Sequence, residues 1–334
     1  ATREALAQTA REALPGWTLD ETISSSPSLH ECQGFLGRKV TITSLSEGAR
    51  LVVHSGVAPC LSEADQSLLL AAESGDTDAL AGALDAGAAL SATGDGRYGS
   101  TALHIASGSS HEGAVRLLLE RGADPNTVSE EGLVPLMHAT AEVARLLLDA
   151  GADPNPEAGY GTGTPLGNAV ISDDLEHIQL LLEAGADPDV RIPILNHQGA
   201  LHFAVTNGSS AAVRLLLEAG ADPDLADELG YTPLLSVVSG REIGNPEIAI
   251  EIARLLLAAG ANANHASNDY NSYAWTPLME AARNGEAEIV RFLLTVGDVD
   301  LSARNTEHQT ALAVARFEGY ADVVAVLEAA GAPE

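Results

Sequence analysis

Residues 101–126 read TALHIASGSSHEGAVRLLLERGADPN, and this stretch decides the fold. Thr101 can cap a helix with its hydroxyl, because the first N–H groups of a helix have no backbone partner. Residues 115–119 then place apolar side chains at positions i, i+3 and i+4, which predicts an amphipathic second helix. Gly122 follows where a helix needs a left-handed residue to end, and the Asp-Pro pair after it turns the chain outward. The stretch therefore predicts two helices followed by an extended connection.

Both marks of this stretch recur along the chain. The Gly-Ala pair returns after steps of 35, 29, 34, 35, 40, 37 and 34 residues, at Gly87, Gly122, Gly151, Gly185, Gly220 and Gly260 and less perfectly at Gly297 and Gly331. A helix start of Thr or Gly, then Pro or Ala, then Leu precedes most of these glycines, at Thr101, Thr164, Gly199, Thr232, Thr276 and Thr310, with a degenerate copy at Val134. One helix pair cannot bury both of its faces, so the pairs are expected to stack around a continuous core.

This pattern resembles the ankyrin repeat, with its Thr-Pro-Leu-His helix start, its Leu-Leu-Leu second helix and its Gly-Ala-Asp turn into a hairpin. The resemblance covers residues 64–334 in about eight copies, with atypical opening and closing repeats at 67–88 and 310–331. It implies a mainly α fold, an ankyrin-repeat solenoid of helix-turn-helix repeats with hairpin fingers. It also implies that His104 and His202 are structural, and that the chain binds a partner through its concave face.

Three repeats depart from the regular length. Residues 139–142 shorten the repeat that ends at Gly151, residues 239–248 lengthen the one that ends at Gly260, and residues 268–274 enlarge the finger that follows. We expect regular curvature to break at these places. They are where we expect the shape to be specialised.

Charge narrows the class of partner. The 334 residues include 17 Lys and Arg against 47 Asp and Glu, for a formal net charge of −30. Residues 63–334 hold 12 of the basic and 41 of the acidic side chains, so the charge lies almost entirely in the repeats. Such a surface repels nucleic acid and anionic membranes, so we expect neither as a partner and favour a basic protein instead.

The opening region is built differently. Residues 1–62 predict a small α+β region, with a helix over 3–14 and a β-hairpin in which Val40 and Ile42 face Leu51 and Val53 across a turn at 44–49. We expect it to cover the apolar end of the first repeat, with a docking or signalling role as the alternative. Residues 63–334 are the predicted repeat domain.

Aromatic side chains concentrate in the predicted fingers. An exposed aromatic side chain is a typical interface anchor, so we expect partner contacts at Tyr98, Tyr160, Tyr231, Tyr270, Tyr273 and Trp275. Tyr231 and Trp275 directly precede Thr-Pro, so packing is an alternative for them. Four acidic residues exceed what the turns need and form a candidate negative rim, with an ordinary solvated face as the alternative: Asp189, Asp224, Asp227 and Glu228.

Other motifs favour neither a cofactor nor a catalytic site. GDGRYG at residues 94–99 has the spacing of a dinucleotide-binding loop, but it lies in a predicted finger, without the strand and helix that such a loop needs. His30, Cys32, His54 and Cys60 are not spaced as a compact metal site, so we expect no metal. Cys32 and Cys60 could be free buried thiols or a disulfide. A cytoplasmic location is favoured, with export possible if the disulfide forms.

These observations favour a non-enzymatic protein-interaction module that binds a basic protein through its concave face and aromatic fingers, in an inhibitor-like or immunity-like role. The alternatives are an enzyme or a small-molecule binder, with a pocket at the irregular repeats or at the junction with the opening region, and a passive scaffold in a larger assembly.

Overall fold

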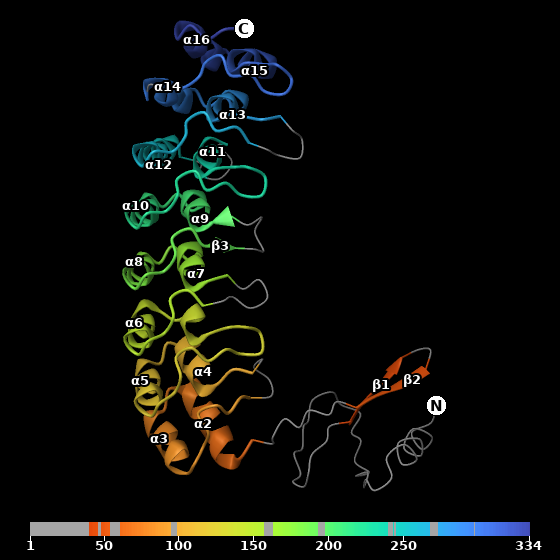
Figure 1. Cartoon of the computed structure of the whole chain (residues 1–334), viewed down its shortest axis with the longest axis vertical. Helices are drawn as coiled ribbons and strands as arrows, with labels where there is room; N and C mark the ends of the chain where they lie inside the picture. Colours follow the sequence, from red (N-terminus) through yellow and green to blue (C-terminus); the bar gives the residue numbers. More distant parts are fainter. Residues whose placement is uncertain are drawn as a thin grey trace. The chain divides into compact units, whose positions relative to one another are not determined.

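The computed structural model describes two units, Ala1–Cys60 and Leu61–Glu334 (Figure 1). In the first unit it describes the backbone of residues 40–45 and 48–53. In the second it describes residues 61–94, 99–156, 163–192, 198–239, 243, 245–267, 273–296 and 298–334. Tyr98, Tyr160 and Tyr270 lie outside these residues, as do Cys32, Cys60 and the helix expected over 3–14.

The first unit contains the expected hairpin. Strands β1 (Val40–Leu45) and β2 (Gly48–Val53) pair antiparallel, with Val40 opposite Val53 and Leu45 opposite Gly48.

The second unit consists of eight successive helix pairs, which confirms the expected solenoid of about eight repeats. The helices span Glu63–Ser74 (α2), Thr77–Asp85 (α3), Ala102–Gly108 (α4), Glu112–Glu120 (α5), Pro135–His138 (η1, a 3₁₀ helix), Ala141–Asp149 (α6), Pro165–Ile171 (α7), Leu175–Glu183 (α8), Ala200–Thr206 (α9), Ser210–Glu218 (α10), Pro233–Val238 (α11), Pro246–Ala258 (α12), Pro277–Asn284 (α13), Ala287–Thr295 (α14), Ala311–Glu318 (α15) and Ala321–Ala329 (α16). None of the helices in the described part of the chain combines the length and the hydrophobicity needed to span a bilayer.

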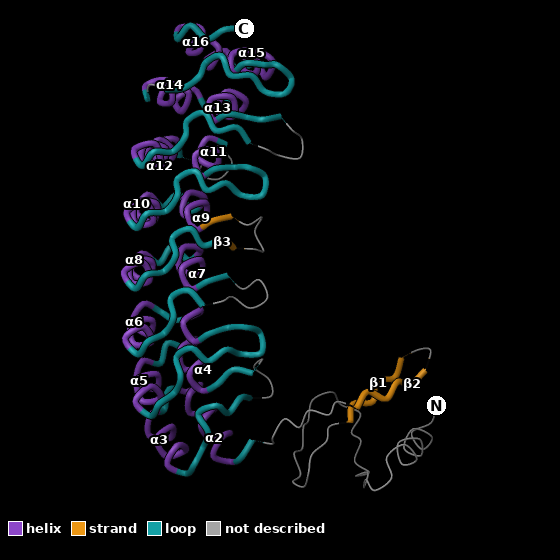
Figure 2. Tube along the Cα trace, in the orientation of Figure 1, coloured by secondary structure: helices purple, strands orange, loops and turns teal. Residues whose placement is uncertain are grey.

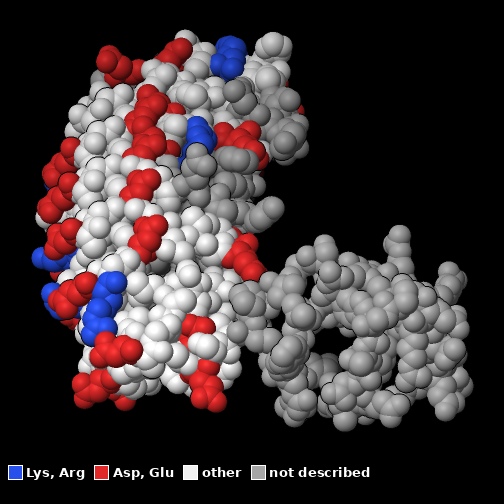
Figure 3. Space-filling model, turned by 60° about the horizontal axis from the view of Figure 1, so that its bottom comes forward, with Lys and Arg blue, Asp and Glu red and all other residues white. Residues whose placement is uncertain are grey.

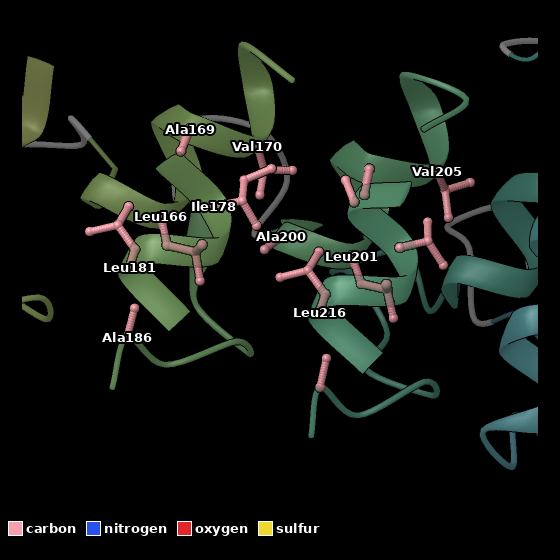
Figure 4. Close-up of a cluster of buried hydrophobic side chains, with 14 of the residues drawn as sticks. Leu166, Ala169, Val170, Ile178, Leu181, Ala186, Ala200, Leu201, Val205 and Leu216 are labelled. Atoms are coloured by element: carbon pink, nitrogen blue, oxygen red, sulfur yellow. The ribbon is translucent and has the colours of Figure 1, made fainter. Parts of the chain in front are cut away.

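The first helices of the repeats pack in one row and the second helices in another (Figure 1). The connections from each second helix to the next first helix, which we call the fingers, extend on the side of the first helices (Figure 2). One buried cluster runs from Leu68 in α2 to Leu327 in α16. In Figure 4, Leu166 and Leu181 of one repeat occupy the positions that Leu201 and Leu216 occupy in the next. Each repeat therefore buries its apolar side chains against its neighbours.

The helix boundaries lie at the residues that mark each repeat. Oγ1 of Thr164 accepts the N–H of Gly167 (3.1 Å), and Pro165 is the first helical residue. A proline is tolerated there because the first-turn N–H groups have no intrahelical partner. At the other end of a helix pair, Gly122 takes a φ of +90° after α5, and the N–H of Ala123 donates to the carbonyl of Leu118 (2.9 Å).

Two irregular repeats are built differently from the expectation. In the short repeat, the missing residues come mainly from the first helix, which shrinks to the single turn of η1, while Ala141 and Glu142 already belong to α6. In the long repeat, the extra residues are shared between the connecting loop and α12, because this helix begins at Pro246 and has 13 residues.

Strand pairing in the described parts of the fingers is short. β3 (Arg191–Ile192) pairs with β4 (Gln198–Gly199), and Thr93 makes a single bridge with Thr101. The fingers therefore depend on other interactions to hold their shape.

Candidate partner-binding surface

The fingers and the first helices together form one side of the repeat unit, which we call the finger face (Figure 1). The second helices lie on the opposite side. The finger face therefore contains the predicted aromatic contacts that the structure describes, Tyr231, Tyr273 and Trp275.

Buried polar side chains hold the bases of the fingers. Asp227 is only 9% exposed, and its Oδ1 accepts the N–H groups of Leu229 and Tyr231, both at 2.9 Å. Ser129 and Asn305 bind the residue four positions later in the same way. In the enlarged finger the equivalent bond spans eight residues, from the N–H of Trp275 to Oγ of Ser267 (3.1 Å).

Two histidines connect the first helices to the fingers. Nε2 of His202 lies 2.8 Å from the carbonyl of Tyr231, while Nδ1 accepts the N–H of Gly199. Because Nδ1 accepts, the ring proton lies on Nε2 and donates to that carbonyl. His104 makes the same contact with the carbonyl of Leu133 (2.9 Å). The structural role implied by the family resemblance is therefore observed for both histidines.

Asp189 and Asp224 join adjacent repeats. Oδ1 of Asp189 accepts the N–H of Asp222 (2.8 Å), and both oxygens of Asp224 accept the N–H of Asn262 (2.8 and 3.1 Å). Side chains in the same register make the equivalent bonds at three other junctions, with Asn126 binding Asp153, Asn155 binding Asp187 and Asn264 binding Asp300. These carboxylates hold the turns together in addition to contributing negative charge. Glu228 is exposed.

The described aromatic residues of the enlarged finger form a stack. The rings of Tyr273 and Trp275 lie 5.6 Å apart with an interplanar angle of 27°. Trp275 is only 8% exposed, and the guanidinium of Arg283 lies 5.2 Å from its ring centre. Tyr273 remains half-buried. Trp275 is thus a packing residue, while Tyr273 carries the stack toward the surface.

Arg283 is fixed by Glu280, a pair that sequence reasoning missed. The Glu280 side chain is 1% exposed and accepts hydrogen bonds from Nη2 (2.5 Å) and Nε (3.2 Å) of Arg283. These bonds raise the pKa of Arg283. Counting four residues from each helix cap, α4, α9 and α15 carry the apolar Ile105, Phe203 and Val314 at this position, while α7 and α11 carry the uncharged Asn168 and Ser236. A carboxylate where these helices have uncharged side chains was the signal that could have revealed the pair.

Phe317 was also missed. It lies in the last turn of α15 and is 80% exposed. It belongs to the closing repeat, in the register of Arg283, and only a comparison of the repeats in register could have singled it out.

Acidic side chains recur along the repeat unit and outnumber basic ones on the face shown in Figure 3. Among the described residues, no group of three or more His, Cys, Asp or Glu side chains is arranged to hold a metal ion. The repeated carboxylates are therefore spread along the stack.

A separate cavity of about 550 Å³ lies at the C-terminal ends of α12 and α14. Its lining includes Arg254, Leu257, Ala258, Val296 and Asp298, with the turn residues 260–264. Asp298 replaces the Ala of the usual Gly-Ala pair, and the residue after Asn262 is Ala where four other turns have Pro. These two differences in sequence distinguish this junction between two irregular repeats from the others.

Comparison with known proteins agrees with this geometry. The family model described as "Ankyrin repeats (3 copies)" matches residues 50–129, 68–158, 166–267 and 247–332. The chain is similar to the NAD-capped RNA hydrolase NUDT12 of Homo sapiens and of Macaca fascicularis, with 48% identity over 63 residues, which is 19% of this chain and 13% of each relative. It is also similar to XBAT35 of Arabidopsis thaliana, whose name places it among E3 ubiquitin-protein ligases, with 33% identity over 128 residues, 38% of this chain and 26% of the relative.

Proposed function

Since the chain belongs to the ankyrin repeat family, we propose that it is a non-enzymatic protein-interaction module that binds a basic protein partner through its finger face. The family accounts for a protein partner, and the basic character is our own extension of it. Blocking that partner, as an inhibitor or immunity-type protein would, is the role that this mode of binding fits best.

The observation that carries this proposal is the negative charge of the repeats combined with aromatic side chains on the finger face. The repeats hold nearly all of the net charge of −30, and Tyr231, Tyr273 and Phe317 reach the surface of the finger face. A strongly acidic field accelerates the encounter with a basic protein, while aromatic side chains supply most of the affinity once contact is made. Asp189, Asp224 and Glu228 contribute to this field.

The relatives lend support only to binding. The chain spans about an eighth to a quarter of the length of these relatives, so their hydrolase and ligase activities are not part of the proposal.

The test is affinity capture on the full chain, followed by titration of the captured protein. We expect a partner with a basic isoelectric point, an affinity that falls as salt rises, and a loss of at least about tenfold on replacing Tyr270 and Tyr273 together by Ala. Leu175→Ala, which alters an exposed side chain of the second helix α8, serves as control and should change the affinity less than about twofold. An affinity indifferent both to salt and to the double substitution contradicts the proposal.

For residues 1–62 we propose the role expected from the sequence, a cover for the apolar end of the first repeat. Removing residues 1–60 should then lower the midpoint of thermal unfolding and expose apolar surface that binds the dye ANS. Unchanged melting would favour the docking or signalling role.

The cavity at α12 and α14 supports a second candidate function, small-molecule binding. Its volume lies within the range of ligand pockets, and its lining combines apolar side chains with Arg254 and Asp298. A fragment screen by thermal shift tests it, with Ala258→Phe filling the cavity and Glu218→Phe, in the same register of α10, as control. Fragments that still raise the melting temperature of the Ala258→Phe variant do not bind in the cavity and would contradict this second function.

A further inference from the structure

Phe317 is the most exposed large apolar side chain among the residues that the structure describes. It lies in the last turn of α15, in the register that Arg283 occupies in α13. A ring held on a helix has few torsions to order on binding, which is why such side chains serve as interface anchors. The exposed ring of Phe317 is therefore a candidate contact for a binding partner.

Side chains from three successive repeats interact with Arg283, which has the register of Phe317 one repeat earlier. Arg283 binds Glu280 and packs on Trp275, as described above. The hydrogen bonds that Arg283 donates to Glu280 are the main reason for the raised pKa of Arg283, and Tyr231 and Glu318 add to it. Tyr231 precedes α11 and Glu318 is the residue after Phe317. The carboxylate beside Phe317 is thus within electrostatic range of Arg283.

The charge of this cluster selects the occupant. Both arginines in the last turns of α13 and α15 are already paired, Arg283 with Glu280 and Arg316 with Glu328 and Glu334, so Glu318 adds a further negative charge. The repeats as a whole carry 41 acidic side chains against 12 basic ones. A Lys or Arg side chain could lie on the ring of Phe317 as a cation–π partner and pair with the carboxylate of Glu318. An acidic peptide, a nucleic acid or a second copy of this chain would bring negative charge to the surface and be repelled.

We infer that the last turns of α13 and α15 form a docking site for a basic segment of the protein partner, with Phe317 as the anchor and Glu318 as the ion-pair acceptor for a Lys or Arg of that segment. This inference rests on the proposed function, because it assigns a place on the finger face to the partner's contact. The stack of Tyr273, Trp275 and Arg283 belongs to the preceding repeat, whose helix α13 packs against α15.

The test uses a randomised library of 12-residue peptides displayed on phage and selected against the full chain. Enriched peptides are synthesised and titrated against the wild type, Phe317→Ala, Glu318→Gln and the control Leu175→Ala, each shown by circular dichroism to be folded. We expect enrichment of Lys and Arg, a loss of at least about tenfold with Phe317→Ala, a loss of about threefold with Glu318→Gln and an unchanged affinity with Leu175→Ala.

Other results overturn the inference. If the enriched peptides are acidic or uncharged, or if Phe317→Ala binds them as Leu175→Ala does, the site is not at α15. If the wild type forms dimers in light scattering and Phe317→Ala does not, the surface is a contact between copies. Basic peptides that bind in a salt-dependent way but ignore Phe317 would remove this site and leave the proposed function standing. Peptide binding that ignores both salt and Phe317 would count against both.

Discussion

A histidine lies in the apolar core of α8. His177 is 4% exposed, and its Nε2 has no hydrogen-bond partner among the described residues. Burial lowers the pKa of His177, and the nearby Asp174 offsets this only in part. Second helices on either side have Ala114, Val143 or Ala212 in the same register. The histidine therefore reduces the stability of a layer that other repeats fill with apolar side chains.

Replacing His177 by Leu should raise the free energy of unfolding by about 1–3 kcal/mol at neutral pH, because it removes an unsatisfied buried group. The substitution should also weaken acid sensitivity. Since the folded-state pKa of His177 lies below its ordinary value near 6.5, the unfolded chain binds the proton first as pH falls. The titration of His177 therefore does not affect stability above about pH 6.5 and destabilises the fold increasingly as the pH falls toward the folded-state pKa. Thermal melts from pH 8 to pH 5, roughly the range in which histidine titrates, measure both effects.

The control for this prediction is His138→Leu, at an exposed histidine of η1. It should leave the stability at neutral pH unchanged. Equal melting of His177→Leu and the wild type would show that water or a conformational adjustment satisfies the ring.

The pair of Glu280 and Arg283 supports a second residue-scale prediction. Glu280→Ala leaves Arg283 against Trp275 without its partner, so we expect a loss of roughly 3 kcal/mol, moderated because Arg283 is 26% exposed. Glu280→Val with Arg283→Leu, which copies the register of Val314 and Phe317 in an apolar form, should regain most of that loss. Urea unfolding measures both variants. If the double variant is no more stable than Glu280→Ala, the loss does not come from leaving Arg283 without its partner.

At the scale of elements, five of the eight described second helices share an unfavourable charge arrangement at their C-terminal ends. α3, α5, α6, α8 and α10 all end on an acidic residue, and none of them has a basic residue in its last turn. The C-terminal end of a helix carries partial negative charge, so each of these carboxylates is repelled by its own helix. The repeat sequence places them about one repeat apart, which adds repulsion between neighbours.

Glu218→Lys, at the end of α10, should therefore stabilise the protein by about 0.5 kcal/mol. Glu288→Lys, in the first turn of α14, is the matched control, because it changes the net charge equally but puts a cation at the positive end of a helix. We expect that variant to be less stable than Glu218→Lys by about 1 kcal/mol, measured by thermal melting at low salt. If the two variants have the same melting temperature, the change in stability comes from net charge and not from the helix dipole.

Local signals predicted most helix boundaries, because caps such as Thr164 and Thr276 and end residues such as Gly122 act within a few residues. Interactions between repeats were harder to predict. Asp189 and Asp224 look like surplus acids in the sequence, yet each binds a backbone N–H some 33 or 38 residues away. Loop length likewise did not determine whether the extra residues of the long repeat would lie in the loop or, as at Pro246, in the helix.

At the scale of the whole molecule, the negative charge of the repeats opposes folding but favours the binding of a basic partner. Carboxylates along residues 63–334 repel one another in the folded stack more than in the expanded chain, so screening should stabilise the fold. The same screening should weaken attraction to a basic partner. Salt can also act without screening charges, because ions excluded from apolar surface favour the burial of that surface. This effect would strengthen folding and binding together.

We therefore expect the melting temperature of the free chain to rise as NaCl increases from about 0.01 M to about 0.15 M, while the affinity for a basic ligand falls over the same range, because the screening length shrinks from about 30 Å to about 8 Å. Thermal melts of the chain alone and titrations of the selected basic peptides supply the two curves. Potassium glutamate at matched ionic strength should reproduce both, since screening depends on ionic strength. A melting temperature and an affinity that rise together would attribute the salt effect to apolar burial, and the acidity of the repeats would then need another explanation than the attraction of a basic partner.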